Sequence, residues 1–142
     1  MTDIKSDSKL NILSRNTDIN KHKENTSLFI FRRDFRLYDN TALYRCFKES
    51  KTVYPIFIFT PEQVTNKNEF KSSNAIQFMI TSLQDLHTFQ KLQELTLFQG
   101  NYIDVLKQII NNNPQISAIY TNTDYTPYAI KRDIDINNLC KS

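Results

Sequence analysis

Four short apolar runs alternate with longer segments of helical periodicity, and this alternation constrains the fold more than any other feature of the sequence. The runs are residues 28–31, 53–59, 95–99 and 116–120. They are too short for helices and are typical of strands that are covered on both faces. Strands that alternate with helices pair in parallel through right-handed crossovers. The sequence therefore predicts an α/β fold, a doubly wound parallel sheet of four or five strands flanked by helices.

Capping residues separate the strands from the predicted helices. Their short polar side chains accept hydrogen bonds from the free N–H groups of a helix's first turn. Apolar side chains then recur three and four residues apart, which is the spacing of one helix face. A polar connection over residues 62–71 precedes the longest helix. The predicted caps are Asp39 or Asn40, Ser72 or Ser73, and Thr126 followed by Pro127 at the first helical position, and a turn at Gly100-Asn101 leads into a further helix.

The chain has 142 residues, the size of one domain, and its net charge of +3 is too small to indicate nucleic-acid binding. Residues 1–26 are polar and without periodicity, so we expect a disordered tail ahead of an α/β domain over residues 27–142. No apolar run is long enough for a membrane span or a signal peptide. These features predict a soluble, intracellular protein of the cytoplasm or nucleus, without a membrane partner.

Glycine and cysteine usage excludes several kinds of site. Gly100 is the only glycine, so the sequence lacks both the Gly-x-Gly-x-x-Gly dinucleotide fingerprint and the phosphate-binding P-loop. Cys46 and Cys140 lie far apart, with no clustered histidines. This pattern is not that of a zinc site, and we expect no metal.

Charged residues follow the first predicted strand, where an α/β sheet receives its ligand. Arg33, Asp34 and Arg36 occupy this corner, and Asp124 follows the fourth strand at the same edge. Two interpretations remain open. The charges of the first corner, with Asp39, either line a binding site or pair with one another to complete the turn.

The segment from Phe31 to Leu43 resembles the opening motif of the DNA photolyase and cryptochrome family, Arg-Arg-Asp-Leu-Arg-Leu-x-Asp-Asn-x-Ala-Leu, with Phe35 in place of the first leucine. Residues 120–133 resemble the family's later Asn-x-Asp-Tyr-x-Pro-Tyr segment, and residues 82–86 resemble its Ser-Leu-x-Asp-Leu helix. The likeness runs from about Ser27 to Cys140. It implies the N-terminal α/β domain of a photolyase.

In that family the carboxyl edge of this sheet holds an antenna chromophore, which is a deazaflavin, a folate or a flavin. Phe57, Phe59 and Tyr125 are aromatic residues able to stack on such a ring. Three departures from the family pattern, at Thr60, Ala75 and the pair Tyr128-Ala129, each remove a polar contact to an antenna. The resemblance implies an antenna pocket formed by Arg33, Asp34, Arg36, Phe59, Thr60, Asp124 and Tyr125.

The family places its catalytic FAD, its lesion pocket and its tryptophan relay in a helical C-terminal domain, and this sequence contains no tryptophan. We therefore expect no catalytic residues here. The resemblance implies the N-terminal domain of a split or truncated photolyase. Such a domain would contribute to light-dependent repair of pyrimidine dimers only together with a separate FAD-binding chain, and it would contact DNA indirectly, through that chain. One alternative is a stand-alone or degenerate module that binds a chromophore or nucleotide without enzymatic activity. The least favoured alternative is an unrelated enzyme of the nucleotidyl-transfer or adenine-nucleotide α-hydrolase class. We further expect Arg132 and Asp133 to form surface or intersubunit pairs.

Overall fold

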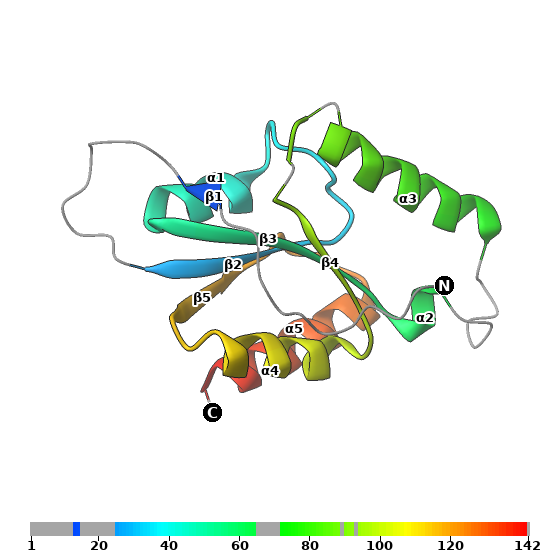
Figure 1. The fold of residues 1–142 in the computed structure, drawn as a ribbon. Coiled ribbons are helices and arrows are strands. Elements are labelled where there is room, and N and C mark those ends of the chain that lie inside the picture. Colours follow the sequence, from blue (N-terminus) through cyan, green and yellow to red (C-terminus); the bar gives the residue numbers. More distant parts are fainter. Residues whose placement is uncertain (1–12, 15–24, 65–71, 89, 93, 142) are drawn as a thin grey trace.

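The computed structural model describes residues 13–14, 25–64, 72–88, 90–92 and 94–141. At its centre is a parallel sheet of four strands in the spatial order β4, β3, β2, β5 (Figure 1). This arrangement confirms the predicted α/β class and parallel pairing. The strands are β2 (Thr26–Phe31), β3 (Thr52–Phe59), β4 (Thr96–Gln99) and β5 (Ile116–Tyr120).

Helices cover both faces of the sheet (Figure 1), as a doubly wound fold requires. Because successive strand residues point to opposite faces, Phe29 and Phe31 pack towards α1 and α3, whereas Leu28 and Ile30 pack towards α4 and α5. These four side chains are at most 1% exposed. The helices are α1 (Thr41–Glu49), α3 (Ser73–Thr88), α4 (Tyr102–Asn112) and α5 (Pro127–Lys141).

The predicted helix caps are present, and Asn101, predicted only as part of a turn, caps α4. Asn40 accepts a hydrogen bond from the Leu43 N–H at 3.1 Å, and Asn101 accepts from the first turn of α4. The Ser72 hydroxyl accepts from Ala75 N–H at 3.4 Å, and the Thr126 hydroxyl accepts from Ala129 N–H at 3.3 Å. Each of these bonds satisfies a donor that the helix itself leaves free.

Two short elements were not predicted. Within the segment expected to be disordered, β1 (Leu13–Ser14) pairs antiparallel with the start of β3, and Thr26 already belongs to β2. Residues 1–12 and 15–24 of that segment lie outside the described residues. The polar connection begins with a one-turn helix, α2 (Pro61–Val64), because Thr60 C=O accepts the N–H groups of Gln63 and Val64. Residues 65–71, which complete that connection, also lie outside the described residues.

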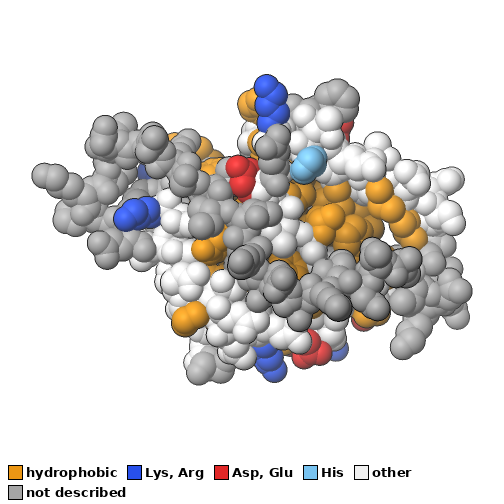
Figure 2. Space-filling view, in the orientation of Figure 1, with side chains coloured by type: hydrophobic (Ala, Val, Ile, Leu, Met, Phe, Trp, Pro, Cys, Tyr) orange, Lys and Arg blue, Asp and Glu red, His pale blue; other side chains and the backbone are white. Residues whose placement is uncertain are grey.

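The N-terminal half of α3 presents much of its apolar surface to solvent. Leu83 and Leu86 are buried, but Phe78 is 73% exposed. On the face shown in Figure 2, hydrophobic side chains gather along this helix and between it and the sheet. None of the helices in the described part of the chain has the length and apolarity that crossing a membrane requires.

Candidate functional site

A cavity of about 470 Å³ lies at the carboxyl edge of the sheet, where the strand order reverses. β3 and β4 lie on one side of β2, and β5, which the chain reaches by a crossover, lies on the other. Loops at such a reversal diverge and leave a crevice, which is the usual ligand position of doubly wound sheets. The cavity is lined by residues from the ends of β2 and β3, from α2 and α4, and from the loop after β5 together with α5.

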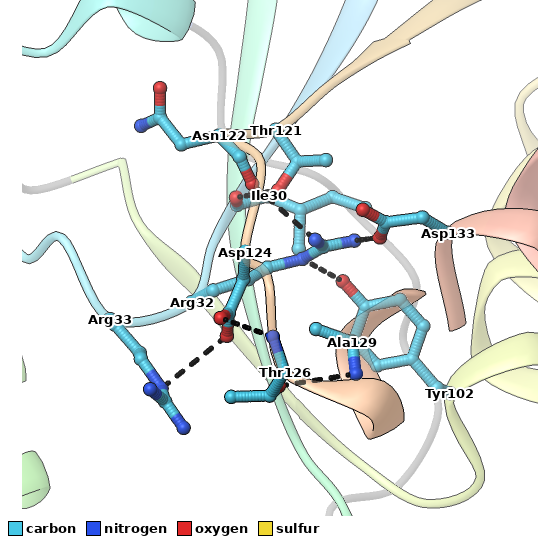
Figure 3. Close-up of polar contacts among 10 residues, drawn as sticks. All are labelled: Ile30, Arg32, Arg33, Tyr102, Thr121, Asn122, Asp124, Thr126, Ala129 and Asp133. Atoms are coloured by element: carbon cyan, nitrogen blue, oxygen red, sulfur yellow. Dashed lines mark hydrogen bonds and ion pairs between the residues drawn. The ribbon is translucent and has the colours of Figure 1, made fainter. Parts of the chain in front are cut away.

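Arg32 follows β2 directly and is only 7% exposed. Its guanidinium forms an ion pair with Asp133 of α5 at 2.6 Å and donates longer hydrogen bonds, both 3.4 Å, to Tyr102 Oη and to the Asn122 carbonyl (Figure 3). Burial by itself would lower the pKa of Arg32, but the Asp133 carboxylate and Tyr102 raise it, and the net direction is upwards. The prediction that Asp133 forms a surface pair is wrong, since its partner is a buried arginine.

Arg33 and Asp124, both predicted site residues, meet at the cavity. Arg33 Nε lies 3.5 Å from Asp124 Oδ2 (Figure 3), although the Arg33 side chain is 75% exposed. Asp124 Oδ1 accepts the Thr126 N–H at 3.2 Å. Asp124 therefore joins the loop after β2 to the start of α5.

Asp34 and Arg36 do not line the cavity. Asp34 accepts a hydrogen bond from Asn122, whose amide also donates to Asn40 Oδ1 at 2.8 Å. Burial raises the pKa of the Asp34 carboxyl, and backbone N–H groups oppose the rise. Arg36 lies 4.0 Å from Asp39. For these two residues the structure favours the second interpretation, in which the charges complete the turn.

Thr60, at the end of β3, lines the cavity and is 2% exposed. Its backbone N–H donates to Gln63 Oε1 at 3.1 Å, but its hydroxyl has no hydrogen-bond partner among the described residues. Phe57 also lines the cavity, whereas Phe59 packs edge-on against Phe57 with ring centroids 4.9 Å apart and does not line it. Tyr125 is 84% exposed and lies outside the cavity lining.

Arg132, Tyr102 and Tyr128 line the cavity but, like Arg32, were not among the predicted site residues. Arg132 of α5 places its guanidinium 5.1 Å from the ring centroid of Tyr102 and 5.5 Å from that of Tyr128. Burial and the neighbouring charge of Arg32 lower the pKa of Arg132. Its Nε atom has no hydrogen-bond partner within the described residues. The four-residue spacing of Tyr128 and Arg132, one helical turn, was the available signal for this pair.

The cavity has the composition of a site for a planar ligand. Aromatic side chains supply apolar surface, and polar donors without protein partners remain at Thr60 and Arg132. Ligand sites of this size range are mostly apolar, with a few placed polar groups. No group of three or more potential metal ligands occurs among the residues that the structure describes.

The structure is an α/β domain of the doubly wound type with a cavity at the usual ligand position of that fold. The family model for DNA photolyase matches residues 27–142, and the chain belongs to this family.

Individual relatives agree with this assignment. The chain is 33% identical over 100 residues to a cryptochrome DASH of Idiomarina loihiensis. This alignment covers 66% of the chain and 22% of the cryptochrome. It is 28% identical over 125 residues to the (6-4) DNA photolyase of Arabidopsis thaliana, covering 82% of the chain and 22% of the relative. The chain thus spans less than a quarter of the length of these curated relatives.

A crystal structure of an archaeal photolyase from Sulfolobus tokodaii superposes with a TM-score of 0.74 at 41% identity. The match covers 82% of this chain and 27% of that one. That structure is described as containing two FAD molecules, with the implication of a novel light-harvesting cofactor. The shared region is again the N-terminal α/β domain.

Proposed function

We propose that this protein is the antenna-type N-terminal domain of a DNA photolyase or cryptochrome and that it binds a light-absorbing chromophore at the carboxyl edge of its sheet. The single observation that carries the proposal is the cavity of about 470 Å³ at the strand-order reversal, in a chain of the photolyase family. Its volume falls within the range of small-molecule sites. Arg33, Thr60 and Asp124 are the predicted antenna residues that line it.

A flavin-type chromophore fits this cavity best. Phe57, Tyr102 and Tyr128 offer aromatic surface to a planar ring, and the Thr60 hydroxyl can donate to a ring or side-chain acceptor. The two FAD molecules described for the archaeal photolyase support a flavin over a deazaflavin or a folate. When bound, such a group would absorb light and pass the excitation energy on.

We further propose that the light-dependent repair of pyrimidine dimers requires a separate FAD-binding photolyase chain, through which the protein meets DNA. β5 pairs with β2 along one edge, and along its other edge it pairs with no strand of the described residues. On the adjacent α5, Ile130 and Ile134 are 49% and 55% exposed and lie one helical turn apart. An unpaired strand edge beside an apolar helix stripe is a suitable docking surface for another chain.

The experiment is reconstitution followed by spectroscopy. The purified chain is mixed with FAD, FMN or riboflavin, gel-filtered and scanned between about 300 and 500 nm, with a Tyr128→Ala variant as a control because Tyr128 lines the cavity and is 51% exposed. We expect bound flavin absorbance that this variant loses. If none of the three flavins co-elutes with the native chain, the proposal of a flavin chromophore is wrong.

Repair is tested separately by adding a candidate FAD-binding chain and illuminating DNA that carries a thymine dimer. Repair only in the presence of both chains supports the partner proposal. Flavin binding without any complex formation would instead favour the alternative, a stand-alone chromophore- or nucleotide-binding module without enzymatic activity.

A further inference from the structure

We propose that Thr60 and Arg132 form the anion contact of the cavity and select a planar chromophore that carries a phosphate group, of the flavin mononucleotide class. This inference rests on the proposed chromophore binding and names the ligand class and its specificity residues. Neither residue belongs to the charged corner after β2. They come from distant parts of the chain, the end of β3 and the second turn of α5, and line the same cavity.

The Thr60 hydroxyl is a buried polar atom without a protein partner. The residue is 2% exposed, and no described residue makes a hydrogen bond to Oγ1. Its backbone is fully used, since N–H donates to Gln63 Oε1 and C=O accepts from Gln63 and Val64. A buried hydroxyl that remains unpaired costs free energy, so nearly all such groups in native proteins have a partner. A ligand oxygen in the cavity would supply this partner.

Arg132 is the positive charge that the local carboxylates do not neutralise. Arg32 pairs with Asp133 and Arg33 pairs with Asp124, whereas no ion pair joins Arg132 to a carboxylate of the described residues. Its guanidinium is held between the rings of Tyr102 and Tyr128, which fixes its position without satisfying Nε.

The surroundings of Arg132 favour an anion as well. Burial and the positive charge of Arg32 both lower the pKa of Arg132, so a bound anion would relieve an unfavourable arrangement.

A phosphate monoester matches this pair of donors better than a neutral group. It carries nearly two negative charges at neutral pH and three acceptor oxygens, so it can accept from a guanidinium and a hydroxyl together. The ring of the same ligand would lie against Phe57 or the tyrosines that line the cavity.

The test compares FMN with riboflavin, which differ only in the phosphate. Dissociation constants are measured by quenching of flavin fluorescence at fixed ionic strength. We expect the native chain to bind FMN at least about tenfold more tightly than riboflavin, which is the effect of one charge-assisted hydrogen bond. Inorganic phosphate should compete with FMN but not with riboflavin.

Arg132→Gln and Thr60→Val should each weaken FMN binding by about tenfold, with riboflavin binding changed less than about twofold. Thr60→Ser keeps the hydroxyl and should bind FMN as the native chain does. Arg45→Gln, which removes an exposed arginine of α1 remote from the cavity lining, is the matched charge control and should change neither constant. Thermal melting of each variant verifies that it is folded.

Equal affinity for FMN and riboflavin in the native chain would overturn this inference and leave chromophore binding intact. Binding of neither flavin would overturn both. A loss of FMN affinity in Arg45→Gln equal to that in Arg132→Gln would show a general charge effect and also contradict the proposed contact.

Discussion

Removing the charge of Asp133 should destabilise the domain strongly, because its partner Arg32 is a buried cation. The Arg32 side chain is 5% exposed and the Asp133 side chain 33% exposed, with an N···O distance of 2.6 Å. The remaining polar contacts of Arg32, to Tyr102 and to the Asn122 carbonyl, are both 3.4 Å long and do not compensate a charge. Asp133→Asn keeps the shape and one carbonyl oxygen but leaves the guanidinium unpaired.

Breaking one side of a buried ion pair costs 3–5 kcal/mol in general, and the partial exposure of Asp133 places this case at about 3 kcal/mol. For a domain of this size that loss corresponds to a fall in Tm of roughly 10 °C. The assay is urea denaturation followed by far-UV circular dichroism, with an unchanged m value as evidence that the compactness of both states is unaltered.

Two variants test the reasoning behind this magnitude. The double variant Arg32→Met with Asp133→Leu removes both charges and should recover most of the lost stability, because no unpaired charge remains. Arg45→Gln breaks the exposed ion pair with Glu49 and should leave the urea midpoint unchanged. A midpoint for Asp133→Asn equal to that of the native chain, or a double variant no more stable than the single one, would refute the argument.

Three further predictions concern stability. Leu106→Ala, at a fully buried position of α4, should cost about 3 kcal/mol of unfolding free energy. Ile134→Ala, at a 55% exposed position of α5, should cost less than about 1 kcal/mol. Urea denaturation of both variants measures the two losses, and equal losses would contradict the prediction. Burial raises the pKa of Asp34 in the folded state, so its stabilising contribution is present below the unfolded pKa and is lost as pH rises through the folded pKa. The unfolding free energy of Asp34→Asn minus that of the native chain should therefore increase between about pH 3 and 6. A difference that stays constant over this range would contradict the shift. Gly100→Ala should lose about 1–2 kcal/mol, since φ is +148° and a Cβ would lie 3.1 Å from Val105 Cγ2; an unchanged thermal midpoint would refute this strain.

Local signals predicted the elements of this fold well. The apolar runs became the four parallel strands, and Asn40 and Thr126 became caps, because both features depend on residues within one turn or one strand. The elements that were missed, β1 and α2, are short and depend on partners elsewhere. β1 exists through its pairing with β3, which no local pattern indicates.

The candidate site was predicted less completely. Arg33, Thr60 and Asp124 line the cavity as expected, whereas Phe59 and Tyr125 do not. Whether any of these residues contacts a chromophore stays a prediction. Arg132 was expected in a surface or intersubunit pair and not in the site, because its place over the Tyr102 ring arises from the packing of α5 against α4.

Arg32 and Arg33 show where the sequence by itself stops. Strand alternation and the capping residues determined that an α/β sheet would present this arginine pair at its carboxyl edge. Both arginines lie in the bend that follows β2, so strand alternation does not settle which of them faces the interior. Only the tertiary structure decided that Arg32, at 7% exposure, is the buried one, because the carboxylate that neutralises it, Asp133, comes from a helix a hundred residues later in the chain.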